Sequence, residues 1–160
     1  MNDVIILCGK TAAGKTTYAK RLQKEKRAVI LSVDEVMLKV SDQCEGRKAH
    51  LELARRVNEY LMEFSLSLIR QGIVCVFDYG YWTKEERRRI CTFFKERQIP
   101  YTLICMEADE RTRLERLAVR NETNAMKEGR QYIITEEMLR RFDGWFEPVE
   151  ADEDAVFLFS

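Results

Sequence analysis

A short loop near the start of the chain has the residue types needed to hold phosphate. The stretch "GKTAAGKT", residues 9–16, matches G-x-x-x-x-G-K-[ST] at every fixed position. The glycines let the backbone curl so that several N–H groups point inward. A helix that begins directly after the loop adds the positive end of its dipole. The sequence therefore predicts a nucleoside triphosphate site, and its glycine spacing differs from that of a dinucleotide fingerprint.

The predicted phosphate site covers nine consecutive residues. Lys15 is expected to reach the β- and γ-phosphates, which makes it a catalytic residue, and the Thr16 hydroxyl is expected to ligate Mg²⁺. The full set of nucleotide-binding residues is Gly9, Lys10, Thr11, Ala12, Ala13, Gly14, Lys15, Thr16 and Thr17.

Two aspartates follow apolar runs in the way expected of acidic groups at strand ends. Asp78 comes after "IVCVF" and would hold Mg²⁺ together with Thr16. Asp34 comes after "VILSV" and would accept a proton from an attacking hydroxyl. The alternative for each is helix capping, a role that aspartate often fills. Asp34 begins "DEVMLKV", which fits a short capped helix.

A segment rich in arginine, "DERTRLERLAVRN", covers residues 109–121. Arg113, Arg116 and Arg120 are spaced three and four apart, so they share one helical face. Arginines over a triphosphate neutralise charge on the transferred group, and a guanidinium can stack on adenine. The alternative is a solvated face paired with Glu110 and Glu115. Given the phosphate loop, we expect Arg116 and Arg120 to face the nucleotide.

Other polar and aromatic residues give weaker signals. The arginines at 87–89 lie in a predicted amphipathic helix and are expected to form a solvated face. The only histidine, His50, has no partner at ligand spacing and is expected at the surface. Tyr79, Tyr81 and Trp82 follow a predicted strand and either wall an acceptor pocket or belong to the core and its rim.

The elements that must position these residues alternate along the chain. Apolar runs predict strands at 3–8, 28–33, 73–77, 101–106 and 155–159. Periodic segments and capping residues predict helices over 15–26, 47–70, 84–97, 109–120 and 135–146. Strands that are apolar on both faces and separated by helices indicate a mostly parallel sheet covered on two sides. Ligands bind beyond the carboxyl ends of such strands, where the loop and the aspartates fall.

Length and composition indicate one globular domain, residues 1–160. Hydrophobic residues make up 46% and charged residues 34%, with only two prolines. Lys plus Arg and Asp plus Glu are 27 each, and this balance argues against strong non-specific binding to nucleic acid or a membrane. The apolar run at 4–8 is too short for a signal peptide or a membrane span. The five cysteines form no C-x-x-C, so we expect free thiols and a cytoplasmic location.

Five stretches in order resemble a known family. "GKTAAGKTT", "SVDE", "VFDYGYWTKEER", "RLAVRN" and "FEPVEADE" are similar to segments of small single-domain P-loop kinases of the AAA type. Relatives of that family include chloramphenicol phosphotransferase, the kinase module of polynucleotide kinase, and zeta toxins. The resemblance implies a P-loop NTPase three-layer α/β sandwich with a five-stranded sheet and an arginine-rich lid. It also implies that Asp34 is the base and that the lid carries Arg116 and Arg120.

The resemblance extends to the adenine region with one departure. It implies that the segment after Glu147 passes near the adenine, but Val149 stands where many relatives have proline. Its members phosphorylate different acceptors, so the acceptor stays open.

Three functional hypotheses follow. The first is an ATP- and Mg²⁺-dependent phosphotransferase that moves the γ-phosphoryl group to a hydroxyl of a small-molecule or nucleotide-like acceptor. The second is a polynucleotide 5′-hydroxyl kinase, which needs a basic groove for the strand. The third is an ATP-binding or ATPase switch with no acceptor, which has no need for Asp34 beside the phosphates.

Overall fold

The computed structural model describes residues 3–41, 46–127 and 132–160, and its centre is one five-stranded sheet. The sheet has the order β2-β3-β1-β4-β5, and every neighbouring pair is parallel. The predicted α/β class and five-stranded sheet are confirmed. The strands are β1 (Val4–Cys8), β2 (Val29–Ser32), β3 (Cys75–Asp78), β4 (Tyr101–Glu107) and β5 (Val156–Phe159).

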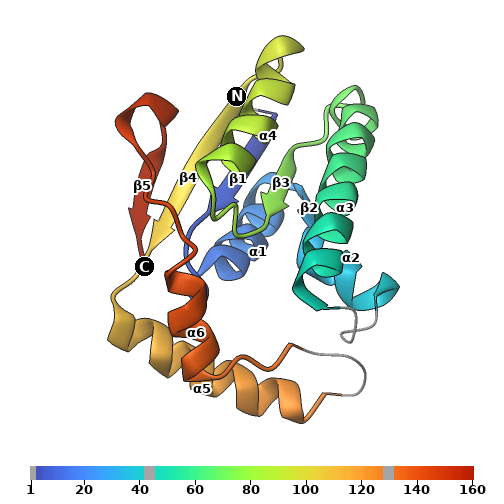
Figure 1. Cartoon of the computed structure of the whole chain (residues 1–160). Helices are drawn as coiled ribbons and strands as arrows, with labels where there is room; N and C mark the ends of the chain where they lie inside the picture. The colour runs from blue at the N-terminus through green and yellow to red at the C-terminus, as the bar shows by residue number, and fades with distance from the viewer. Residues whose placement is uncertain (1–2, 42–45, 128–131) are drawn as a thin grey trace.

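Helices cover both faces of the sheet and extend past one edge. Figure 1 shows α3 and α4 in front of the sheet and α1 behind it. It also shows α5 and α6 beyond the carboxyl ends of the strands, where the predicted lid belongs. The helices are α1 (Lys15–Lys26), α2 (Val33–Val40), α3 (Gly46–Ile69), α4 (Lys84–Glu96), α5 (Glu110–Ala125) and α6 (Glu136–Asp143), with a 3₁₀ turn η1 at Ala151–Glu153.

The core is divided into two layers by the alternation of side chains along β1. Val4 and Ile6 point to the face packed by α3 and α4, whereas Ile5 and Leu7 point to the face packed by α1. All four are at most 5% exposed, so both faces are buried, as expected for parallel strands. A third, smaller cluster of Leu117, Ile134 and Leu139 joins α5 to α6.

The helix start signals are confirmed. Thr83 and Glu86 form a capping box at α4, Asp109 accepts from the backbone N–H of Thr112 at α5, and Thr135 caps α6. These caps satisfy first-turn N–H groups that have no partner within the helix.

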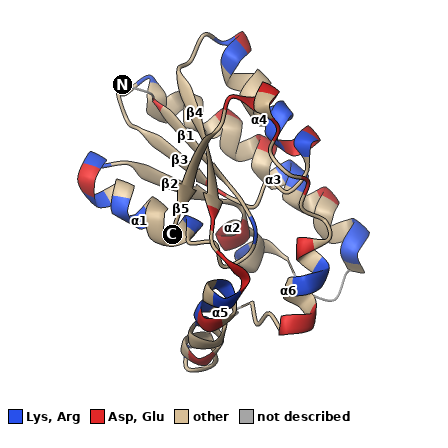
Figure 2. Cartoon of the chain, turned by 90° about the vertical axis from the view of Figure 1, so that its left-hand side faces the viewer, with Lys and Arg blue, Asp and Glu red and all other residues tan. Residues whose placement is uncertain are grey.

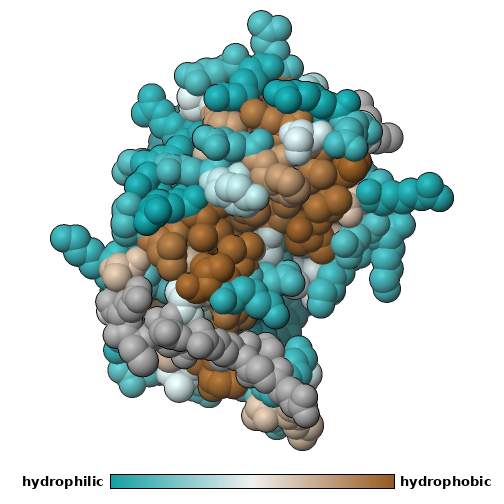
Figure 3. Space-filling view, turned by 90° about the vertical axis from the view of Figure 1, so that its right-hand side faces the viewer, coloured by the Kyte–Doolittle hydropathy of each residue, from teal (hydrophilic) through white to brown (hydrophobic). Residues whose placement is uncertain are grey.

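The outer surface of α2 and α3 is partly hydrophobic. Figure 3 shows hydrophobic side chains gathered in the middle of the face that these helices present, with hydrophilic side chains around them. The exposed large hydrophobic residues of the two helices are Val40, Leu51, Tyr60 and Phe64. Within the described part of the chain, no helix is both long and apolar enough to span a membrane.

The cysteines are unpaired where the structure describes them. Cys8, Cys75 and Cys105 are buried in strands and Cys91 is half-buried on α4, and all four are free thiols. Cys44 lies outside the described residues.

Candidate active site

The loop between β1 and α1 has the shape that its glycines predict. Gly9 has a φ of 137° and Gly14 a φ of 93°, values that favour glycine. A Cβ at position 9 would lie 2.4 Å from the backbone oxygen of Met106 in β4, so the close approach also requires glycine. Ala12 lies between them with a φ of 62°, which completes the tight curl of the loop.

The N-terminus of α1 is open towards this loop. Its N-cap is Gly14, which has no side chain to occupy the free N–H groups. The Lys15 ammonium donates to the carbonyl oxygens of Gly9 (2.9 Å) and Lys10 (2.8 Å), so it lies inside the loop. Burial lowers the pKa of Lys15, while Asp78 and Asp34 act in the opposite direction. The arrangement suits an anion with several negative oxygens.

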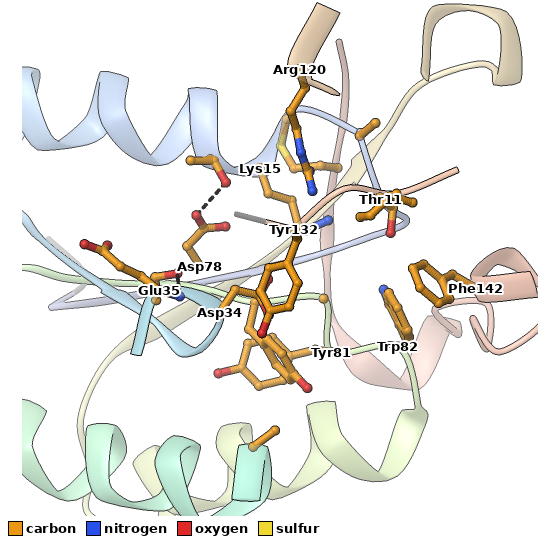
Figure 4. Close-up of a pocket in the computed structure, with 18 of the residues that line it drawn as sticks. Thr11, Lys15, Asp34, Glu35, Asp78, Tyr81, Trp82, Arg120, Tyr132 and Phe142 are labelled. Carbon is orange, nitrogen blue, oxygen red and sulfur yellow. Dashed lines mark hydrogen bonds between the residues drawn. The ribbon is translucent and has the colours of Figure 1, made fainter. Parts of the chain in front are cut away.

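Thr16 and Asp78 lie together although they are 62 positions apart in the chain. The Thr16 hydroxyl donates to the Asp78 carboxylate at 2.7 Å, shown as a dashed line in Figure 4. Burial raises the pKa of Asp78, and the hydrogen bond from Thr16 and the charge of Lys15 partly offset this. A hydroxyl and a carboxylate are oxygen ligands of the kind that Mg²⁺ prefers, so this pair fits the ion. Among the described residues no group of three or more His, Cys, Asp or Glu could hold a metal, so phosphate oxygens and water would complete the coordination.

Asp34 lies in the first turn of α2 and faces the cleft. Ser32 is the N-cap and its hydroxyl accepts from the backbone N–H of Glu35 at 3.2 Å, so the capping alternative for Asp34 is wrong. Figure 4 shows Asp34 near Asp78 and below the ring of Tyr132. Asp34 is exposed in the open cleft, but the protein atoms that surround its carboxylate partly desolvate it, and this desolvation, with the charge of Asp78, raises its pKa. A raised pKa makes a carboxylate a better proton acceptor.

The arginines of α5 divide between two environments. Arg120 lines the cleft and its guanidinium lies beside Lys15 in Figure 4. Arg116 contacts the loop, with Nη1 3.5 Å from the carbonyl oxygen of Ala12 and 2.9 Å from the Ser160 hydroxyl. Arg113 is instead 3% exposed and donates to both carboxylate oxygens of Asp143 on α6, at 2.8 and 2.6 Å. The structure thus brings Arg116 and Arg120 to the loop, and Arg113 links the lid helices.

The expectation of a solvated face at 87–89 is wrong for its first residue. Arg87 is fully buried, and it pairs with Glu153 at 2.6 Å. It also donates to the carbonyl oxygens of Tyr81 and Trp82, at 3.1 and 3.2 Å. Burial of this guanidinium is tolerated because all its donors find acceptors.

The aromatic residues after β3 serve both of the roles that the sequence left open. Tyr81 is 1% exposed and its hydroxyl donates to Asn58 at 2.7 Å, so it belongs to the core. Trp82 lines the cleft and packs on Phe142 of α6 with ring centroids 5.2 Å apart. Phe142 and Trp145 also line the cleft, and no local sequence pattern predicted them there. His50, which was expected at the surface, lines the cleft as well.

The segment after Glu147 first runs along α4 and then enters the sheet as β5. Glu147 accepts from the backbone N–H of Lys84 at 2.6 Å, and Val149 packs against the main core. Only its last residue reaches the phosphate loop, where the Ser160 hydroxyl donates to the carbonyl oxygen of Ala13 at 2.8 Å. The expectation that the segment passes near the adenine stays a prediction.

These residues surround one open cleft of about 1950 Å³. The phosphate loop and the arginines of α5 form one wall, and α2, the first half of α3 and the loop after β3 form the other. The cleft lies at the carboxyl ends of β1, β2 and β3, as predicted for a doubly covered parallel sheet.

A parallel sheet of this order, with a G-x-x-x-x-G-K-T loop between β1 and α1, defines a P-loop NTPase fold. The family model described as AAA domain matches residues 4–149, and the chain belongs to that family. No curated protein matches the sequence at a significant level.

Solved structures share the fold over the whole chain. A protein of Chloroflexus aurantiacus provisionally classed as a kinase superposes with a TM-score of 0.72 at 18% identity, over 99% of this chain and 84% of that one. A gluconokinase from Sinorhizobium meliloti 1021 gives 0.63 at 11%, over 98% and 81%. Chaetomium thermophilum Kti12, solved with ADP-AlF3, gives 0.65 at 14%, over 98% and 88%. At such identities the similarity establishes the fold.

Proposed function

We propose that the protein is an ATP-dependent phosphotransferase that moves the γ-phosphoryl group to a hydroxyl of a small-molecule acceptor. The observation that carries this proposal is the position of Asp34. Its carboxylate faces the cleft beside Lys15 and Asp78, and a different residue, Ser32, caps the helix on which it lies. A carboxylate placed there has no structural duty in capping and is suited to take a proton.

The chain's own residues have separate roles in this proposal. Lys15 and the backbone N–H groups of residues 9–16 bind the phosphates, and Arg120 stabilises charge on the transferred group. Arg116 contacts the loop at the carbonyl oxygen of Ala12, where its guanidinium can share in neutralising this charge or can stack on the base. Mg²⁺, held by Thr16 and Asp78 when bound, would neutralise charge between the β- and γ-phosphates.

The transfer step is a displacement at the γ-phosphorus. Asp34 accepts the proton of the acceptor hydroxyl while the bond from the hydroxyl oxygen to the γ-phosphorus forms. The bond from that phosphorus to the bridging oxygen breaks, and ADP leaves with the electron pair.

The test is Asp34→Asn, assayed with γ-labelled ATP against a panel of hydroxyl compounds. We expect ATP affinity to stay within about threefold and transfer to fall about 100-fold or more, the range for loss of a general base. The matched control is Glu25→Gln, which removes an exposed carboxylate at the far end of α1 and leaves both quantities unchanged. Unchanged transfer in Asp34→Asn would refute the role of Asp34.

The surface supports a small acceptor over a polynucleotide. Figure 2 shows Lys and Arg interspersed with Asp and Glu on α4 and α5, which gives no continuous basic stripe on these helices. A polynucleotide strand needs such a stripe to neutralise its phosphates. A failure of every hydroxyl compound to accept phosphate, with ATP still hydrolysed, would favour the switch hypothesis.

A further inference from the structure

We propose that the acceptor carries a planar aromatic ring and an anionic group beside its hydroxyl, the combination found in a nucleoside monophosphate. This inference rests on the proposed phosphoryl transfer, because it concerns the part of the cleft next to Asp34. Three features of that part carry it: an aromatic slot, a cation with no carboxylate partner among the described residues, and the position of both in the same cleft as Asp34.

The slot lies between Trp82 and Tyr132. Figure 4 shows Trp82, backed by Phe142, on one side of the cavity, and the ring of Tyr132 on the other, above Asp34. On its far side Trp82 packs against Phe142 with the rings tilted by 33° and their centroids 5.2 Å apart. Among the described residues Tyr132 has no aromatic ring partner, so its ring is available to a ligand. A flat ring between two such walls gains stacking contact on both faces.

The chain holds Trp82 in this position by two contacts. Its carbonyl oxygen accepts from Arg87, and the backbone of Gly80 passes so close that a Cβ there would lie 2.5 Å from the indole Nε1. Tyr132 is anchored at its own carbonyl, which accepts from the Asn124 side chain at 3.2 Å. These contacts hold the backbone of both wall residues in place, which lowers the entropy cost of binding.

Arg47 supplies the positive charge. Its guanidinium lies over the ring of Trp145, 3.3 Å from the centroid, in the first turn of α3. The other arginines on this wall are paired with carboxylates: Arg55 with Glu52 and Glu59, and Arg89 with Glu59 and Glu85. Within the described part of the chain Arg47 has no carboxylate partner, and its guanidinium lines the cleft, where it can pair with an anionic ligand.

These groups line one cleft, so a single small molecule can contact all of them. His50 lies close enough to Asp34 to interact with its charge, and Arg47 is three residues earlier on the same face of α3. Arg47 and Asp34 both line the cleft, so a ligand that places its hydroxyl at Asp34 can place an anionic group at Arg47. A nucleoside monophosphate carries its base, its sugar hydroxyls and its phosphate on one ribose. A sugar acid would leave the ring walls unused.

The experiment is calorimetric titration with the ATP site filled by Mg²⁺ and a β,γ-imido analogue. The probes are the four common nucleoside 5′-monophosphates, the corresponding nucleosides, and gluconate. We expect at least one monophosphate to bind about tenfold or more tightly than its nucleoside and than gluconate, because each of the other two lacks one recognised group.

Three variants locate the contacts. Arg47→Ala should lower the affinity for the monophosphate to that for its nucleoside. Trp82→Ala should lower the affinity for the monophosphate about tenfold, whereas Trp82→Phe, which keeps a planar ring, should retain most of the binding. The matched control is Arg111→Ala, an arginine that is 89% exposed on the outer side of α5, and it should bind like the unmodified protein. Equal affinity for the monophosphate and its nucleoside would overturn the inference, as would full binding in Arg47→Ala.

Binding of the acceptor and transfer of the phosphoryl group are measured separately, so the acceptor class and the phosphotransferase activity are tested independently. Transfer is followed in the same samples by the appearance of a nucleoside bisphosphate when ATP replaces the analogue. Transfer to a neutral alcohol, with no preference for monophosphates, overturns the acceptor class and leaves the phosphotransferase proposal standing. Tight monophosphate binding with no transfer to any hydroxyl overturns the phosphotransferase proposal and leaves the binding site.

Discussion

The buried pair between Arg87 and Glu153 gives the sharpest prediction for stability. Arg87 is fully buried and the Glu153 side chain is 8% exposed. The guanidinium donates five hydrogen bonds: two to the Glu153 carboxylate and three to backbone carbonyls. A guanidinium has five N–H donors, so the group is fully satisfied. Glu153→Ala removes two of these acceptors and the only carboxylate in contact with the charge among the described residues.

The magnitude follows from what remains after the substitution. A charge left buried without its partner costs about 3–5 kcal/mol in unfolding free energy. The whole stability of a domain is about 5–15 kcal/mol, so this is a large share. At about 2–4 °C per kcal/mol for a chain of this size, the expected fall in Tm is roughly 6–20 °C.

The assay is urea unfolding followed by circular dichroism at pH 7, with Tm from a thermal scan. The matched control is Glu25→Ala, whose i,i+4 pair with Arg21 has both side chains more than half exposed and should cost less than about 1 kcal/mol. A second variant, Glu153→Gln, keeps the shape and one acceptor and should fall between the two. Equal losses in Glu153→Ala and Glu25→Ala would refute the claim that the buried pair matters.

Three further predictions test neighbouring contacts. Burial opposes ionisation of Glu153, but hydrogen bonds from Arg87 and from the backbone N–H of Glu150 outweigh it and lower the pKa. The pair therefore contributes its full stability above the unfolded pKa of about 4.3 and loses it as the pH falls through the lower folded pKa, so urea unfolding from about pH 3 to 7 should give a slope that Glu153→Gln reduces. Gly80→Ala should displace the Trp82 indole, cost about 1–3 kcal/mol and change the near-UV circular dichroism, and an unchanged spectrum would contradict the close contact. Asp143→Ala should cost about 3–5 kcal/mol, because Arg113 is 3% exposed and depends on that carboxylate; a loss below 1 kcal/mol would show that the lid helices do not need it.

The features that the sequence predicted depend on local signals. The phosphate loop has fixed residue types because glycine, lysine and threonine each have a separate physical task there. The strands were found because burial on both faces gives continuous apolar runs, and the helix starts at Thr83 and Asp109 were found because caps act within three residues. Asp34 was placed at the cleft by its position after an apolar run, although its helix starts two residues earlier than a cap at Asp34 requires.

The features that the sequence analysis missed depend on contacts between distant segments. Arg87 pairs with a residue 66 positions later, and Arg113 with one 30 positions later, which no local pattern reveals. One signal was nevertheless present: Arg87, Ile90 and Phe94 are spaced three and four apart and form the buried face of α4. A charged residue in phase with an apolar stripe is a candidate for a buried, paired group, whereas its exposed neighbours at 88 and 89 are out of phase.

The buried arginine also connects the two halves of the proposed reaction. The loop at 80–82 carries the aromatic wall of the cleft, and Arg87 holds the carbonyl oxygens of Tyr81 and Trp82 from the side of α4. From the other side, the backbone N–H of Gly9 in the phosphate loop donates to the carbonyl of Gly80 at 3.1 Å. The wall is thus bonded directly to the loop that binds the phosphates, so its distance from the γ-phosphate is set by backbone contacts. Transfer rates fall steeply when reacting groups shift by about 1 Å. Loss of the hydrogen bonds that hold the loop at 80–82 should therefore impair phosphoryl transfer more than ATP binding.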